Sequence, residues 1–182
     1  MRVAATARTT TELGVSTAES VATRVLDGAL THIDQKVAEG DRVMGVVGDD
    51  AWLLISGTLV VLPDVQVARM EFGERRSSFR LLHDLATRRD VGARTNAEGE
   101  LVLFDDAGEL CVLSLGDDAL PKAMRFSDAV AERRYEYDEW KSFGGLVVPA
   151  RYREIGARAT SVEITACESL ATFEPKLFRA PG

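Results

Sequence analysis

The sequence predicts an α+β fold in which a long, curled antiparallel sheet forms an incomplete β-barrel and a two-helix lid is inserted mid-chain. Short β-rich segments separated by Gly and Asp turns run along most of the 182 residues, a pattern typical of an antiparallel meander. Residues 64–89 show helical spacing instead. Because strand twist accumulates, a sheet of about ten strands must curl, and the helices are then available to cover its concave face.

The beginning of the chain carries two competing signals. Candidate strands are Arg2–Thr9 and Val15–Leu26, but apolar side chains in residues 20–37 also recur every fourth position, as on one face of a helix. The pair Asp27-Gly28, a two-residue hairpin signal, and the β-branched content of the segment favour two strands. Periodicity alone predicts a helix. The residues with the helical spacing are Val21, Val25, Ala29, Ile33 and Val37.

The next segment gives clear strand signals. Arg42–Val47, Ala51–Ile55 and Thr58–Leu62 are short apolar runs, each bounded by a turn rich in Gly, Asp or Ser. We therefore expect an antiparallel meander here. The turns are Glu39-Gly40-Asp41, Gly48-Asp49-Asp50 and Ser56-Gly57.

Two helices are predicted in residues 64–89. Asp64 is placed to cap the first helix, and Gly73 is expected to interrupt it. The second helix begins near Ser77 or Ser78, and Arg88-Arg89 near its end complements the helix dipole. The apolar faces consist of Val65, Ala68 and Phe72 in the first helix and of Phe79, Leu82, Leu85 and Ala86 in the second.

Strand signals resume after the helices. A long alternating strand begins near Tyr135, Gly144-Gly145 turns the chain into a second strand through Val147, and Ser161–Glu168 forms a third. The late Phe178 is predicted to plug one end of the sheet. No linker or repeat divides the chain, so residues 1–182 are expected to form a single half-barrel domain. Earlier strands in this half are Val91–Arg94, Leu101–Phe104, Glu109–Leu115 and Lys122–Phe126.

Composition and charge exclude several classes of function. A net charge of −7 argues against nucleic-acid binding, which draws its affinity from clustered Lys and Arg. No run approaches the roughly 18 apolar residues that span a bilayer, so no stable membrane insertion is expected. The N-terminus lacks the apolar block of a secretory signal. The protein is then cytoplasmic, or it is a domain of a longer precursor and is periplasmic or otherwise extracytoplasmic; the abrupt start within strand-like sequence favours the second.

No motif predicts catalysis, a metal site or a cofactor. His32 and His83 lack the spacing of a zinc peptidase. Cys111 and Cys167 have no nearby His, and no Gly-x-Ser-x-Gly elbow occurs. Acidic pairs beside glycine are explained by turn chemistry. We expect a protein that is not an enzyme, with two small buried thiols; a disulfide between them is left open.

Eight large side chains are candidates for the lining of an apolar cavity. They come from the strands and helices that should face one another beneath the lid, and apolar pockets with few polar groups are common in barrel mouths. The alternative is that they form a plain packed core. The candidates are Trp52, Phe72, Phe79, Leu82, Phe104, Tyr135, Tyr137 and Trp140.

Several segments of the sequence resemble those of the LolA/LolB/LppX-like superfamily of lipoprotein-carrier half-barrels. The run Gly40–Trp52 is similar to the family's glycine turn, strand, second turn and tryptophan strand, and the start of the helices at Pro63 also fits. So do Tyr135–Tyr137, Gly144–Pro149 and Leu177-Phe178. The nearest cousins are domains of this fold appended to insulinase-type zinc peptidases in bacteria.

The resemblance implies that Leu30–Val37 is a strand paired with Arg42–Val47, so that the helical spacing is accidental. It also implies a non-enzymatic domain that holds a hydrophobic ligand, either a lipid or an acylated protein, in its concave face, with a peptidase as a candidate partner. The alternative is an accessory protein-interaction module of a larger, peptidase-associated assembly, with a packed core and no ligand. The chain departs from the carriers in lacking a signal peptide and a lipid-attachment cysteine near its start.

Overall fold

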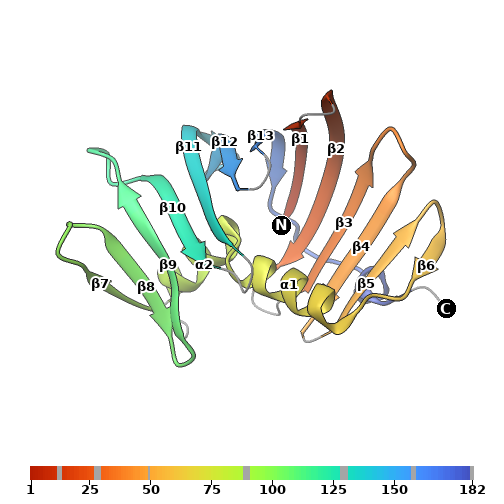
Figure 1. Cartoon of the computed structure of the whole chain (residues 1–182), viewed down its shortest axis with the longest axis horizontal. Helices are drawn as coiled ribbons and strands as arrows, with labels where there is room; N and C mark the ends of the chain where they lie inside the picture. The colour runs from red at the N-terminus through yellow and green to blue at the C-terminus, as the bar shows by residue number, and fades with distance from the viewer. Residues whose placement is uncertain are drawn as a thin grey trace.

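The computed structural model describes residues 1–11, 14–26, 30–48, 50–87, 91–127, 131–156 and 159–180. Within them, thirteen strands form one antiparallel sheet in the order β6-β5-β4-β3-β2-β1-β13-β12-β11-β10-β9-β8-β7 (Figure 1). The sheet is open, and two helices are inserted between β6 and β7, which confirms the predicted curled sheet with a mid-chain lid. The strands are β1 (Arg2–Thr11), β2 (Gly14–Val25), β3 (Leu30–Lys36), β4 (Arg42–Val47), β5 (Asp50–Ile55), β6 (Thr58–Val60), β7 (Gly92–Thr95), β8 (Leu101–Asp105), β9 (Gly108–Leu115), β10 (Pro121–Ser127), β11 (Glu132–Phe143), β12 (Leu146–Ile155) and β13 (Ala159–Glu168).

The first and last strands meet in the middle of the sheet. β1 pairs with β13 on one side and with β2 on the other, so the two free edges of the sheet belong to β6 and β7. The helices α1 (Asp64–Arg75) and α2 (Ser78–Thr87) connect these edges. Figure 1 shows the sheet as a curved wall, with α1 and α2 lying across its concave side.

The competing helix prediction for residues 20–37 is wrong. β2 and β3 pair over residues 19–36, with Ala22 opposite Ile33. β3 then pairs with β4, as the family resemblance implied. Both strands need these partners for their backbone groups, and a lone helix would have left β1 and β4 unpaired at this point, so tertiary pairing overrides the local period. Asp27, Gly28, Asp49, Arg88 and Arg89, which earlier turn and helix-end predictions used, lie outside the described residues.

The helix boundaries differ in part from the prediction. α1 continues through Gly73 to Arg75, so the interruption expected at Gly73 is wrong. Asp64 is the first helical residue rather than the cap. Its negative charge interacts favourably with the positive end of the helix dipole. At α2, the hydroxyl of Ser77 accepts a hydrogen bond from the backbone N–H of Arg80 at 3.3 Å, as predicted for a capping serine.

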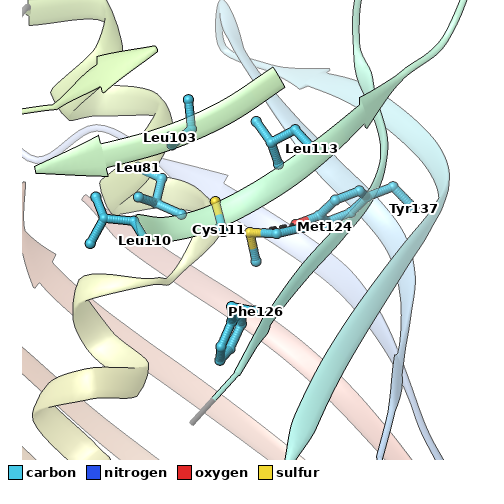
Figure 2. Close-up of a cluster of buried hydrophobic side chains, with 8 residues drawn as sticks. All are labelled: Leu81, Leu103, Leu110, Cys111, Leu113, Met124, Phe126 and Tyr137. Atoms are coloured by element: carbon cyan, nitrogen blue, oxygen red, sulfur yellow. Dashed lines mark hydrogen bonds between the residues drawn. The ribbon is translucent and has the colours of Figure 1, made fainter. Parts of the chain in front are cut away.

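Two apolar clusters fill the space between the sheet and the helices. The first joins α2 to β8–β11, and Leu103 and Cys111 at its centre are completely buried (Figure 2). The Tyr137 hydroxyl reaches the sulfur of Met124 at 3.9 Å in this cluster. The second consists of buried residues from β1, β12 and β13, with Phe79 of α2 packed against it. The first cluster comprises Leu81, Leu103, Leu110, Cys111, Leu113, Met124, Phe126 and Tyr137, and the second Val3, Val148, Ile164 and Cys167.

The outer face of β3, β4 and β5 is covered by the C-terminal segment, the 3₁₀ turn Pro175–Phe178. The strand register aligns Trp52 with Gly45 and Gly45 with His32, so these positions share one face. The Trp52 indole donates a hydrogen bond to the Phe178 carbonyl at 2.9 Å. Phe178 is 1% exposed, so it covers this face rather than plugging an end of the sheet.

Gly45 explains how the Trp52 ring lies flat on the sheet. A Cβ atom at Gly45 would overlap the Trp52 indole, so only glycine leaves room for the ring. The ring also lies 5.8 Å from that of His32, whose pKa is lowered because the imidazole is buried.

The substitution Phe178→Ala should lower the free energy of unfolding by about 3–5 kcal/mol, because it removes a fully buried phenyl ring. Urea denaturation followed by tryptophan fluorescence measures this. The neighbouring Leu177, 36% exposed, supplies the control: Leu177→Ala should cost less than about 1 kcal/mol. Equal losses from the two variants would contradict the anchoring role of Phe178.

The two cysteines should be unreactive in the native protein. Both are free and buried, and they lie in different apolar clusters. Burial raises the pKa of Cys111 to about 12 and also raises that of Cys167, so neither forms the reactive thiolate at about pH 8. A colorimetric thiol assay should detect none before denaturation and both afterwards. Rapid reaction of either thiol in the folded protein would contradict the packing.

Candidate ligand-binding cavity

A cavity of about 310 Å³ lies between α1, the start of α2 and the concave face of the sheet. Its volume is at the lower end of ordinary ligand pockets, about 300–1,000 Å³. The sheet supplies residues from β2, β3 and β4 on one side and from β10, β11 and β12 on the other. The lining residues are Arg24, Thr31, Ile33, Met44, Val46, Arg69, Met70, Gly73, Glu74, Arg76, Ser77, Ser78, Phe79, Met124, Tyr135, Pro149 and Tyr152.

Strand register explains how the sheet half of the lining forms. Thr31 lies opposite Val46, and Ile33 opposite Met44, so these four side chains share the concave face. The alternate positions of the same strands carry His32 and its neighbours under the C-terminal segment. The concave face here is therefore formed by branched and thioether side chains with a single hydroxyl.

A second space of about 320 Å³ adjoins the first along α1. The two share Arg69, Met70 and Gly73 of α1 and Tyr135 of β11. Phe72 joins the lining of the second space. Because one face of α1 borders both spaces, a small displacement of this helix would merge or enlarge them.

An ion pair connects the sheet to α1 at the edge of the cavity. Nη1 of Arg24 lies 2.6 Å from Oε2 of Glu74, and the two side chains are only 14% and 13% exposed. The same Nη1 donates to the hydroxyl of Thr31 at 3.4 Å. The low exposure reduces solvent screening, so this pair holds α1 more strongly than a surface pair would.

Arg76 fixes the junction between the two helices. Its guanidinium stacks on the Phe72 ring at 3.3 Å from the centroid, and its Nε donates to the Leu110 carbonyl at 2.9 Å. Burial and the adjacent Arg75 lower the pKa of Arg76. Arg75 itself pairs with Asp105. The hydrogen bond to Leu110 of β9 and the pair with Asp105 of β8 thus attach the end of α1 to the sheet, while the stack on Phe72 orients Arg76 within the helix end.

The two helices are attached to the sheet in different ways. α2 buries Leu81 and Asp84, and Leu81 belongs to the first apolar cluster. α1 buries none of its side chains. Since burial of apolar area is the main source of stability, α2 is the fixed helix and α1 is the part of the lid that opens at lowest cost.

Two tyrosines supply neutral polar groups to the cavity. Burial raises the pKa of Tyr135 and of Tyr152, so both phenols keep their protons and act as hydrogen-bond donors. Arg24 partly opposes the shift at Tyr152, which places its charge near that hydroxyl. The rings of Tyr135 and Tyr152 lie 6.0 Å apart.

Four of the eight predicted lining residues lie at or beside the cavity, or in the core next to it. Phe79 and Tyr135 line it directly, and Phe72 lines the adjoining space. Tyr137 belongs to the first apolar cluster, where its hydroxyl lies 2.5 Å from that of Ser78. Tyr137 therefore serves the packed core that the alternative reading predicted, next to the cavity rather than in it.

The other four predicted residues line neither the cavity nor the adjoining space. Trp52 is on the outer face under the C-terminal segment, because its register position alternates with the concave one. Phe104 is 37% exposed and packs over Gly92 and Arg94, because Leu103 takes the inward position on β8. Trp140 packs against the first cluster and donates to a backbone carbonyl. Leu82 is half-buried on α2.

Sequence reasoning missed most of the actual lining. It searched for aromatic side chains, whereas the cavity is lined largely by arginines, methionines and small residues. The predicted pairing of β3 with β4 could have identified Ile33, Met44 and Val46, because alternation fixes which positions share a face. No signal in the sequence points to Arg24 and Glu74 as neighbours across fifty positions.

No group of three or more His, Cys, Asp or Glu side chains in the described part of the chain is placed to hold a metal ion. Over the same residues, no helix has the length and apolar character needed to cross a membrane.

Comparison with known proteins gives matches in structure. No protein-family model and no curated protein matches the chain. A DUF1329 family protein from Desulfovibrio piger aligns at 11% identity and a TM-score of 0.60, over 98% of this chain and 88% of that one. A Vibrio parahaemolyticus domain described as an outer membrane lipoprotein-sorting protein domain aligns at 9% identity and a TM-score of 0.61, over 97% of this chain and 88% of that one. This chain shares their fold.

The likeness agrees with the fold that the family resemblance of the sequence implied. At these identities it establishes the architecture, and function has to be argued from the cavity itself. The narrower prediction, of domains appended to insulinase-type peptidases, stays a prediction.

Glu74→Gln should loosen α1. Removing one partner of a poorly exposed ion pair leaves the Arg24 charge without compensation, so we expect a loss of roughly 3 kcal/mol and faster amide exchange over residues 64–75. Hydrogen–deuterium exchange with mass spectrometry measures this. Glu71→Gln, one turn earlier in the same helix, is the matched control and should leave exchange near the parent rate. Identical exchange in the two variants would contradict the role of the ion pair.

Proposed function

We propose that this domain is a non-enzymatic binding protein that holds a hydrophobic ligand, a lipid or the acyl group of a lipid-modified protein, between its concave face and its helical lid. The observation that carries the proposal is the cavity of about 310 Å³ beneath α1. The cavity is partly open to solvent and lies beneath a helix that buries none of its side chains, so a ligand can enter it without disrupting the packed core, which favours ligand binding over plain packing.

The lining suits a flexible apolar chain. Met44, Met70 and Met124 come from β4, α1 and β10 and surround the cavity from three directions. Unbranched thioether side chains adapt to the shape of a bound partner, and they are favoured at surfaces that accept varied apolar ligands. Ile33 and Val46 extend this apolar surface along the sheet.

The shared fold adds support of a second kind. One structural neighbour is described as an outer membrane lipoprotein-sorting domain, and a similar role here would place the protein outside the cytoplasm, in contact with acylated proteins. The volume of the cavity limits the size of the ligand. A single medium-length alkyl chain fits beneath α1 as it stands, and a longer or branched alkyl chain requires α1 to move.

Ile33→Trp should weaken binding of a fluorescent fatty acid about tenfold or more, because the larger ring occupies part of the cavity. Fluorescence titration gives the affinity, and mass spectrometry of organic extracts of the purified protein identifies any lipid that copurifies. Ile155→Trp, at a residue that is 39% exposed and outside the lining, is the matched control. Absence of saturable binding to the folded parent, or equal binding by both variants, would contradict the proposal.

A second candidate function is an accessory module that docks on a larger assembly, with a peptidase as the predicted partner. It is favoured by exposed apolar residues on the edge strand β6, just after it and at the start of α1: Leu59 is 51%, Val61 92% and Val65 63% exposed. An open edge with apolar side chains is a site for pairing with another chain. Leu59→Lys with Val61→Lys should then abolish copurification of a peptidase from the native cell, while leaving fatty-acid binding unchanged; recovery of the same peptidase with the variant would contradict docking through this edge.

A further inference from the structure

The lining of the cavity is positively charged although the chain is acidic. Among the described residues that border it, three are arginines, Arg24, Arg69 and Arg76, and one is a carboxylate, Glu74, whereas the whole chain has a net charge of −7. Arg69 is exposed, but Arg24 and Arg76 are half-buried, where desolvating a charge is costly. A cavity for hydrocarbon alone would not require them.

The arginines are not equivalent. The contacts of Arg76 to Phe72 and to the Leu110 carbonyl explain its position as part of the fold. Arg24 is different, since its described hydrogen bonds to Glu74 and Thr31 both come from Nη1. Its Nε is one of two buried side-chain nitrogen or oxygen atoms without a hydrogen-bond partner in the described part of the chain.

The unpaired Nε of Arg24 is a hydrogen-bond donor that suits an anionic group. A guanidinium presents five N–H groups in a planar fork, and carboxylates and phosphates bind it through two oxygens at once. Glu74 uses one corner of this fork, through Oε2 at 2.6 Å. The Nε–H lies on the same side of the guanidinium as Nη2, so an oxyanion bound through Nε and Nη2 would give the buried Nε the partner that Glu74, on Nη1, does not supply.

The surroundings of Arg24 match one end of an amphipathic molecule. The neutral phenols of Tyr152 and Tyr135 supply further donors on the cavity wall. Phe79 lies beneath the guanidinium, with its ring centroid 6.0 Å from Cζ. The apolar wall of Met44, Val46 and the other aliphatic residues then continues away from this polar end.

We propose that the cavity selects an amphipathic ligand with an anionic head group, a carboxylate or a phosphate, which binds Arg24 through Nε and Nη2, beside Glu74. This inference rests on the proposed function and adds the charge of the ligand to it. Glu74 then holds the Nη1 side of the guanidinium in place, and Arg24 is the specificity-determining residue.

The experiment compares ligands that share one alkyl chain and differ in head group. Isothermal titration of the full chain with dodecanoate, dodecyl phosphate, dodecanol and dodecyltrimethylammonium, each below its micellar concentration, gives four affinities. We expect dodecanoate, dodecyl phosphate or both to bind about tenfold to a hundredfold tighter than dodecanol, and the ammonium ligand to bind weakest. The two anions distinguish a fatty acid from a phospholipid as the source of the head group.

Two variants test the assigned residues. Arg24→Met should remove the preference for anions, and Glu74→Gln should increase it several-fold, because a negative charge beside the bound head group is lost. Each preference is taken as the ratio of anion to dodecanol affinity in the same variant, so changes in lid stability cancel. If Arg24→Met fails to fold, Glu74→Gln and Arg24→Lys still test the head-group assignment. Arg24→Lys keeps the positive charge but lacks the planar pair of N–H donors.

The outcomes separate this inference from the proposed function. Equal binding of the anions and dodecanol to the parent, or an anion preference unchanged in Arg24→Met and Glu74→Gln, would overturn the head-group assignment while the cavity function stands. Failure of all four ligands to bind would overturn the proposed function and this inference with it.

Discussion

The arrangement of the whole molecule depends on where the sheet begins and ends. Because β1 pairs with β13, the free edges belong to β6 and β7, two strands that follow one another in the chain apart from the helices. Their connection has to cross the span of a curled sheet from one edge to the other. α1 and α2 are that connection. A single pairing, of the first strand with the last, therefore puts a lid over the concave face (Figure 1).

The cavity follows from the unequal attachment of the two helices. α2 packs into the apolar cluster of β8–β11, where Leu81 and Leu103 are buried (Figure 2). α1 is held at its C-terminal end by Arg24, Arg75 and Arg76, through two ion pairs and a hydrogen bond to the Leu110 carbonyl. These contacts are polar and few, whereas α2 would have to expose buried apolar side chains in order to move. The space under α1 is therefore bordered by the helix that buries no side chain.

Local sequence predicted the architecture better than the site. Turn residues such as Gly144-Gly145 and the apolar runs between them mark most strands, because each strand meets its neighbour in sequence. The helical spacing of apolar residues around Ile33 predicted a helix where the chain forms β3, because pairing with β2 and β4 outweighs the local spacing. Trp52 and Phe104 were predicted to line the cavity because they are large side chains on strands expected to face the helices, whereas alternation directs both to the outer side. The contact of Arg24 with Glu74 arises only when distant segments meet, so no local pattern announces it.

The most direct test of the central claim uses the methionines as probes. The chain has four: Met44, Met70 and Met124 line the cavity, and Met1 packs against the second apolar cluster. With methyl-¹³C-methionine, NMR titration with dodecanoate should shift the three cavity signals together and to saturation, while Met1 stays in place. A linear drift without saturation, or a shift confined to Met1, would contradict ligand binding beneath the lid.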